Sequence, residues 1–199
     1  YISRSAYPRY YFNIPGVESG FYALEKLPYK QILLLKSTLE LFGQDKLAGL
    51  RDAVFAPAED VRYIISREPH ALAAAQALAF GGTPRQGIIV LYSKNLFDNK
   101  YETAAAIVHE ATHIWQGKGI GCEDPKGRLR REVGDHSITS EFYDWTAEEL
   151  VKAAQLSKIG AYHVSMWVAY QFKQQRLAKW YQEIIRTGRA NDHSVSGCE

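Results

Sequence analysis

The chain has 199 residues, of which 46% are hydrophobic and 13% aromatic, and this length and composition suit one compact domain with a sizeable core. Its 24 basic and 22 acidic residues leave a formal net charge of +2. That balance lacks the basic field of a protein that binds a phosphate backbone. No uninterrupted apolar stretch approaches the ~20 residues that cross a bilayer. We therefore expect no nucleic-acid partner and no membrane span.

The ends of the chain differ in composition from its middle. Residues 1–20 are rich in tyrosine and contain proline and glycine, which predicts an extended arm. A single domain is expected over residues 21–190, before a polar tail over residues 191–199. Cys122 and Cys198 could form one disulfide in an oxidising compartment. Together with the absence of a starting Met, this favours an extracytoplasmic protein, secreted or periplasmic.

The first half of the chain predicts one clear helix and two strands. Apolar residues at helical spacing, ended by a glycine, predict a helix over residues 27–42, and a shorter one is expected over residues 45–54. Residues 61–66 and 87–93 are β-branched and aromatic and too short for confident helices, so they predict strands. The alanine-rich residues 70–80 between them fit either a short helix or a further strand.

The second half of the chain predicts three helices. The first begins after Asn99, which has a glutamate three residues on as in a capping box, and runs through Trp115. Residues 117–135 are rich in glycine and arginine, and predict a solvated loop or a surface helix turn. Further helices are expected over residues 137–157 and 161–186. Together these elements predict an α+β fold, mainly helical, with a small sheet packed on the helix that ends at Trp115.

The strongest motif is an HExxH sequence, formed by residues 109–113 within the helix just described. Because residues four apart share a helix face, His109 and His113 can bind one metal ion while Glu110 lies beside it. Zinc in such a site takes two imidazole nitrogens, a third protein ligand and a water. Glu110 would act as general base on that water. The alternative is a surface helix with two histidines and an incidental glutamate, or two core histidines with satisfied hydrogen bonds. Apolar flanks on both sides argue against it, because they imply a buried helix, where polar groups without partners are costly.

The sequence around this motif resembles the extended signature of the zincin metallopeptidases. The residues flanking the histidines are uncharged and a large apolar residue, Trp115, follows, whereas Ala106 departs from the Val or Thr usual in that family. The resemblance implies a zincin-like α+β domain, a bound Zn²⁺ and a peptide or protein substrate. In zincins the strand before the metal helix often pairs with the substrate, and residues 87–93 would be that strand.

The third metal ligand separates the zincin subfamilies. Metzincins place a glycine and then a histidine at fixed positions after the second histidine, and this chain does not. Resemblance to gluzincins implies a glutamate from a downstream helix. We rank Glu141 first, because Ile138, Glu141 and Trp145 would share an apolar helix face. Glu132 ranks second, since it lies among arginines that could pair with it in water. Asp135, His136 and Glu148 follow.

Zincins also add a Tyr or His that stabilises the oxyanion formed during hydrolysis. Tyr162 and His163, at the start of the last predicted helix, are the candidates, with His136 and Tyr143 behind them. We name His163 as the candidate for this role because it shares a helix face with apolar and aromatic residues that would turn it inward. A core histidine bonded to a backbone carbonyl fits the same pattern, and this alternative stays open.

The sequence therefore predicts a zinc-dependent peptidase. His109, His113 and Glu141 would hold the ion, and Glu110 would activate water against a peptide carbonyl. The alternative is a catalytically inactive zincin-fold protein with a binding or regulatory role, although such a protein has no need of the intact glutamate. Deformylases share the HExxH motif, but they carry a cysteine motif before the helix that is absent here.

Overall fold

A computed structural model describes residues 22–23, 29–47, 49–50, 61–66, 75–81, 86–92, 99–116, 131–134 and 137–188. Side chains are described in the same ranges, except for the strands and one residue of the first helix. The predicted arm over residues 1–20, the tail over residues 191–199 and the two cysteines lie outside these ranges. The statements below concern the described residues.

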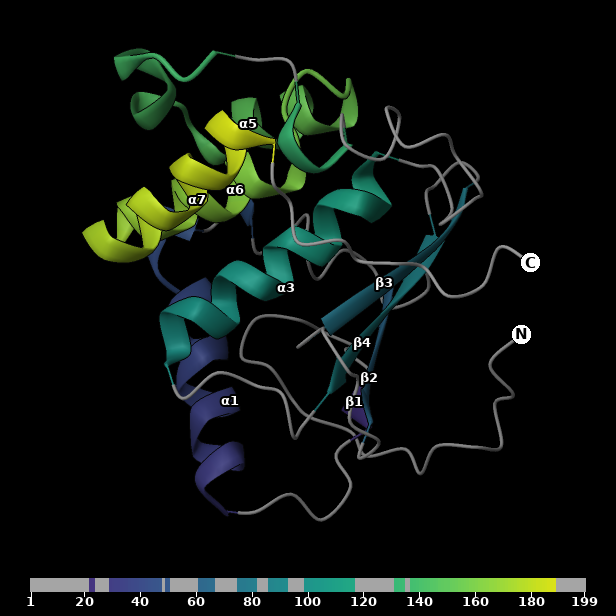
Figure 1. Cartoon of the computed structure of the whole chain (residues 1–199). Helices are drawn as coiled ribbons and strands as arrows, with labels where there is room; N and C mark the ends of the chain where they lie inside the picture. Colours follow the sequence, from purple (N-terminus) through teal and green to yellow (C-terminus); the bar gives the residue numbers. More distant parts are fainter. Residues whose placement is uncertain are drawn as a thin grey trace.

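Helices form most of the described chain, with α3 running through the middle of the molecule and α5, α6 and α7 gathered along one side of it (Figure 1). Among the described residues, no helix has both the length and the apolar character needed to span a membrane. The helices are α1 (Tyr29–Phe42), α3 (Lys100–Trp115), α5 (Ala147–Gln155), α6 (Ala161–Gln171) and α7 (Gln175–Thr187), with the 3-10 helices η1 (Asp45–Leu47) and η2 (Ser140–Asp144).

Four strands are described by their backbone, in the order β1-β2-β4-β3. The inner strand β2 is parallel to both of its neighbours, β1 and β4, whereas β3 is antiparallel to β4. The alanine-rich segment that the sequence left undecided contributes β3, which lies beside α3 (Figure 1). The strands are β1 (Tyr22–Ala23), β2 (Val61–Ser66), β3 (Ala75–Gly81) and β4 (Gln86–Tyr92).

The predicted fold class was a mainly helical, zincin-like α+β domain with a small sheet packed on the HExxH helix. Its mainly helical character is confirmed, but the small sheet needs correction. Where side chains are described, 80% of the residues are helical and none lies in a strand. The buried apolar side chains of these ranges come from helices and from the turns between them. The physical reason is that α3 buries side chains around most of its circumference and packs against α1, α5 and α6. The described core is therefore mainly helical.

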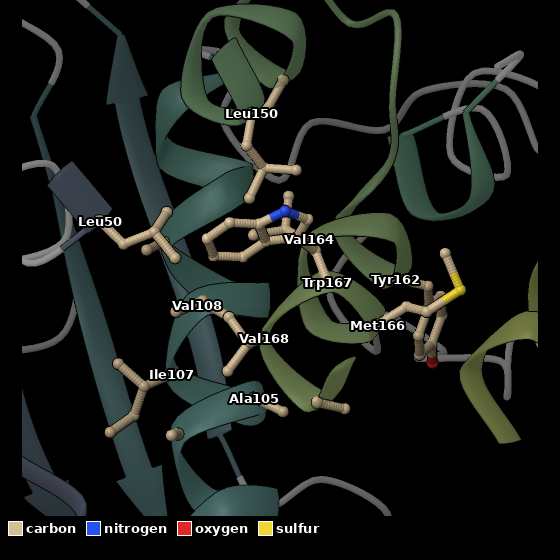
Figure 2. Close-up of a cluster of buried hydrophobic side chains, with 14 of the residues drawn as sticks. Leu50, Ala105, Ile107, Val108, Leu150, Tyr162, Val164, Met166, Trp167 and Val168 are labelled. Carbon is tan, nitrogen blue, oxygen red and sulfur yellow. The ribbon is translucent and has the colours of Figure 1, made fainter. Parts of the chain in front are cut away.

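The centre of this core is the contact between α3 and α6 (Figure 2). The hydroxyl of Ser165 on α6 donates a 2.9 Å hydrogen bond to the carbonyl of Ala105 on α3, and two such small residues let the helix backbones approach. Around this point α6 buries every side chain from Ala161 to Ala169. Trp167 is only 2% exposed, and its indole N–H donates to the carbonyl of Trp145 at 3.2 Å, so its polar atom is satisfied within the core.

Two segments that the sequence predicted as single helices are each divided. In residues 137–157, η2 precedes α5, which begins at a capping box between Thr146 and Glu149. In residues 161–186, α6 ends before Lys173, whose φ of 55° reverses the chain into α7. No glycine or proline marks this second break, so the sequence carries no strong local signal for it.

Candidate metal centre

The helix α3 places the two motif histidines on one face, as their spacing predicts. The carboxamide oxygen of Asn99 accepts a 2.8 Å hydrogen bond from the N–H of Tyr101, which caps the start of the helix. His109 is the tenth residue of this helix, and His113 lies one turn further on. Their ring centroids are 5.0 Å apart, and the ring planes make an angle of 83°. The edges of the two rings can therefore converge on one point.

Glu132, in the helical turn at residues 131–133, brings a carboxylate to that point. Its Oε2 lies 3.0 Å from Nε2 of His109, and its Oε1 lies 3.2 Å from Nε2 of His113. The side chains of the three residues are 7%, 15% and 17% exposed, in the order His109, His113 and Glu132. One carboxylate thus spans both imidazoles in a recess that retains some access to solvent.

Two glycines allow the Glu132 turn to approach the start of α6. Gly134 has a φ of 60°, a backbone conformation that residues other than glycine rarely adopt. A Cβ atom at this position would lie 2.6 Å from the N atom of Gly160. A Cβ atom on Gly160 would in turn overlap the backbone carbonyl of Glu132. The absence of a Cβ atom at both positions therefore allows the Glu132 turn to lie this close to the start of α6.

Charge and burial act in opposite directions on these three residues. Burial alone would raise the pKa of Glu132, but its attraction to His113 and His109 outweighs burial and holds that pKa well below the usual value. Burial would also lower the pKa of His113, yet Glu132 and Glu110 raise it to about 9. For His109 burial prevails over Glu132, and its pKa is lowered. Without a metal ion, Glu132 is therefore a carboxylate, His113 an imidazolium and His109 a neutral imidazole at pH 7.

These three residues could hold a metal ion, because their ligand atoms all lie within 4.8 Å of one another. Ligand atoms of a tetrahedral centre with bonds of about 2.0–2.1 Å lie about 3.3 Å apart. The contacts of 3.0 and 3.2 Å from Glu132 to the imidazoles come close to that spacing. In addition, Oε2 of Glu132 is buried without a directed hydrogen bond in the described part of the chain. A cation between the three side chains would satisfy it.

Glu110 and Tyr162 lie next to these potential ligands. Glu110 is 8% exposed, and its charge contributes to the raised pKa of His113. Tyr162 was a candidate, with His163, for stabilising the oxyanion. Its ring centroid lies 4.6 Å from that of His109. Burial, with the charges of Glu132 and Glu110, raises the pKa of Tyr162. Its phenol therefore keeps its proton and can donate a hydrogen bond near the three ligands.

The structure brings Glu132, which ranked second as the third ligand, to the histidines, and does not bring Glu141 there. Glu141 is exposed on η2 and is not part of the group that could hold a metal. Glu141 would share an apolar face with Ile138 and Trp145 only on a continuous helix through residues 137–157, and η2 does not keep that spacing. Glu148, another candidate, is exposed on α5. Asp135 and His136 lie outside the described residues.

His163 does not join the metal group either. It is fully buried, its Nδ1 accepts a 3.3 Å hydrogen bond from the N–H of Gly160, and its ring lies 5.7 Å from that of Phe142. This is a core histidine at the start of α6, whose Nδ1 bonds to a backbone N–H. Sequence reasoning also overlooked Gln116, which contacts His113; its signal was the three-residue spacing on one helix.

Comparisons of the chain with protein-family models, with curated proteins and with solved structures find no match. The geometry and chemistry of the site are therefore the basis for its function.

Proposed function

We propose that this protein is a zinc-dependent peptidase whose ion is held by His109, His113 and Glu132. The observation that carries the proposal is the convergence of these three side chains, within 4.8 Å, beside the intact glutamate of an HExxH motif. Two imidazole nitrogens and one carboxylate oxygen are a donor set of catalytic zinc sites, which keep a fourth position for water. The same set is the one implied by the resemblance to gluzincins.

Each residue of the site has a separate task in this proposal. Bound zinc would supply a Lewis acid and would lower the pKa of a water that it binds. The carboxylate of Glu110 accepts the proton of the attacking water and later delivers it to the leaving amine. Tyr162, which remains a neutral phenol, donates a hydrogen bond to the oxygen of the peptide carbonyl as negative charge develops on it.

Burial of the site favours this chemistry. Over the whole residue, His109 and Tyr162 are each 5% exposed and Glu110 is 8% exposed. Charges and dipoles interact more strongly in such surroundings than in water. The greater exposure of the His113 and Glu132 side chains leaves one side of the site for a substrate to approach.

The test combines metal analysis with one substitution. Purified protein stripped with a chelator and reloaded should bind one zinc per chain and cleave a mixed library of fluorescence-quenched peptides. Glu110→Gln should retain the zinc and lose cleavage, because the amide cannot accept the proton. Glu148→Gln, a matched change of an exposed glutamate on α5, should alter neither property.

Three results would contradict the proposal. Absence of stoichiometric zinc would remove the metal site itself. Full zinc loading without cleavage would reject the peptidase and favour a metal-binding protein without catalysis. Cleavage that Glu110→Gln leaves unchanged would reject Glu110 as the general base and with it the proposed mechanism.

A further inference from the structure

A single buried amide connects two of the three potential metal ligands. Gln116 follows the last residue of α3 and is 5% exposed. Its Oε1 lies 3.3 Å from Nδ1 of His113. Its Nε2 donates to the carbonyl of Arg131 at 3.1 Å and contacts the carbonyl of Ile159 at 3.5 Å. All three contacts of the Gln116 side chain are with segments that build the site.

The two carbonyls determine which way this amide points. A backbone carbonyl accepts hydrogen bonds and cannot donate them, so the NH₂ group of Gln116 must face Arg131 and Ile159. Its oxygen then faces His113, and because that oxygen only accepts, Nδ1 of His113 must carry a hydrogen. The other ring nitrogen, Nε2, is the one directed at Glu132. When the His113 ring gives up one proton, the amide therefore keeps the hydrogen on Nδ1 and leaves Nε2 as the nitrogen that can bind a metal.

The same amide also holds the turn that carries Glu132. Arg131 immediately precedes Glu132, so the bond to its carbonyl ties this turn to the end of α3. Gln116 also contacts the carbonyl of Ile159, the residue before Gly160. Gly160 in turn packs against the backbone of the Glu132 turn. Movement of the turn away from the histidines would break this partly buried hydrogen bond and leave the carbonyl of Arg131 without it.

We infer that Gln116 is the positioning residue of the metal centre: one amide sets the ring nitrogen that His113 presents and the position of Glu132. The inference rests on the proposed metal site, but its first part concerns the metal-free protein as well.

The first test observes the hydrogen on Nδ1 of His113 by ¹H–¹⁵N NMR of the full chain without metal. A ring N–H bonded to a buried amide exchanges slowly with water, so the wild type should show a protected His113 resonance. Gln116→Met, of similar length, should lose it. Gln116→Glu keeps an acceptor toward His113 and should retain it, although it loses the donor to Arg131. A purely structural role for Gln116 would not distinguish these two variants in this way.

The second test measures metal binding. Gln116→Met should bind Zn²⁺ about 10–100-fold more weakly, the usual effect of removing a partner of a metal-bound histidine. It should also change the visible absorption of the Co²⁺ form, which reports ligand geometry. Gln171→Met is the control, because Gln171 donates a similar 3.2 Å bond to the carbonyl of Tyr143 away from the site. It should leave zinc affinity and the Co²⁺ spectrum unchanged.

The outcomes separate this inference from the proposed function. Wild-type affinity and an unchanged Co²⁺ spectrum in Gln116→Met would overturn the inference while leaving a zinc protein. Absence of a protected His113 N–H in the wild type would overturn it even if Gln116→Met failed to fold. Failure of the wild type to bind zinc would reject the proposed function, and the NMR result would then decide the contact of Gln116 with His113 by itself.

Discussion

Gly160 faces the backbone carbonyl of Glu132 so closely that a Cβ atom at position 160 would overlap the carbonyl oxygen. The two residues belong to different segments, the start of α6 and the turn at residues 131–133. The position of a potential metal ligand therefore depends on the absence of one methyl group.

Gly160→Ala should displace the Glu132 turn and weaken zinc binding by at least tenfold, because the carbonyl and N atoms that it meets are backbone and cannot rotate away. Overpacking of this kind also lowers the free energy of unfolding by about 1–3 kcal/mol. Calorimetric zinc titration and thermal denaturation measure the two effects. In the control Gly43→Ala, the new Cβ atom would lie an ordinary 3.4 Å from the carbonyl of Glu40, and zinc affinity should not change. Wild-type affinity in Gly160→Ala would show that the turn is not held by this contact.

Glu132→Gln and Glu141→Gln should differ sharply in zinc binding. The first removes a charged ligand from between two imidazoles, so its loss of affinity should exceed the roughly 10–100-fold typical of outer partners. The second changes an exposed side chain outside the group, and affinity should be retained. Competition with a chromophoric chelator measures both constants. The reverse result would restore Glu141 as the third ligand.

Zinc affinity should rise with pH up to about 9. Glu132 raises the pKa of His113 to about 9 in the metal-free protein, so at pH 7 to 9 zinc must displace one proton from this ring. His109 is already neutral and Glu132 already charged in that interval, because both pKa values are lowered. Affinity should therefore increase about tenfold per pH unit. Titration calorimetry in buffers of different ionisation enthalpy should detect about one proton released. An affinity that levels off near the ordinary histidine pKa would contradict this.

Tyr162→Phe should lower kcat by about 10²–10³-fold, the usual effect of removing one donor to a developing oxyanion, and should leave zinc affinity unchanged. The ring that contacts His109 is retained in this variant and only the hydroxyl is lost. Tyr143→Phe is the matched control, since that hydroxyl contacts Sδ of Met166 at 3.8 Å and lies on η2. Steady-state cleavage of the peptide found for the wild type gives kcat for each variant, and zinc titration gives the affinity. Equal effects of the two variants would remove Tyr162 from the proposed mechanism.

Local patterns in the sequence identified the elements that carry the site. The apolar spacing and the glycine stop predicted α1 to within two residues of its start, and Asn99 marked the beginning of α3. The HExxH spacing placed His109 and His113 on one face, because four residues complete about one helical turn. These properties depend on residues a few positions apart, which the sequence displays directly.

Predictions that assumed continuous helices were less successful. The preference for Glu141 depended on an α-helix from Ser137, whereas the chain forms η2 there and starts α5 only after Thr146. The last predicted helix breaks at Lys173 without a glycine or proline. Tertiary packing overrides weak local preferences in such segments.

The sequence by itself determined the two histidines, the adjacent Glu110 and the helix that presents them, because helical periodicity is a local property of the chain. Only the tertiary structure decided that Glu132 completes the group. That choice depends on the contact of Gly160 with the Glu132 turn and on the bond from Gln116 to Arg131. Both join segments distant in sequence, and packing of α3 against α6 brings them together.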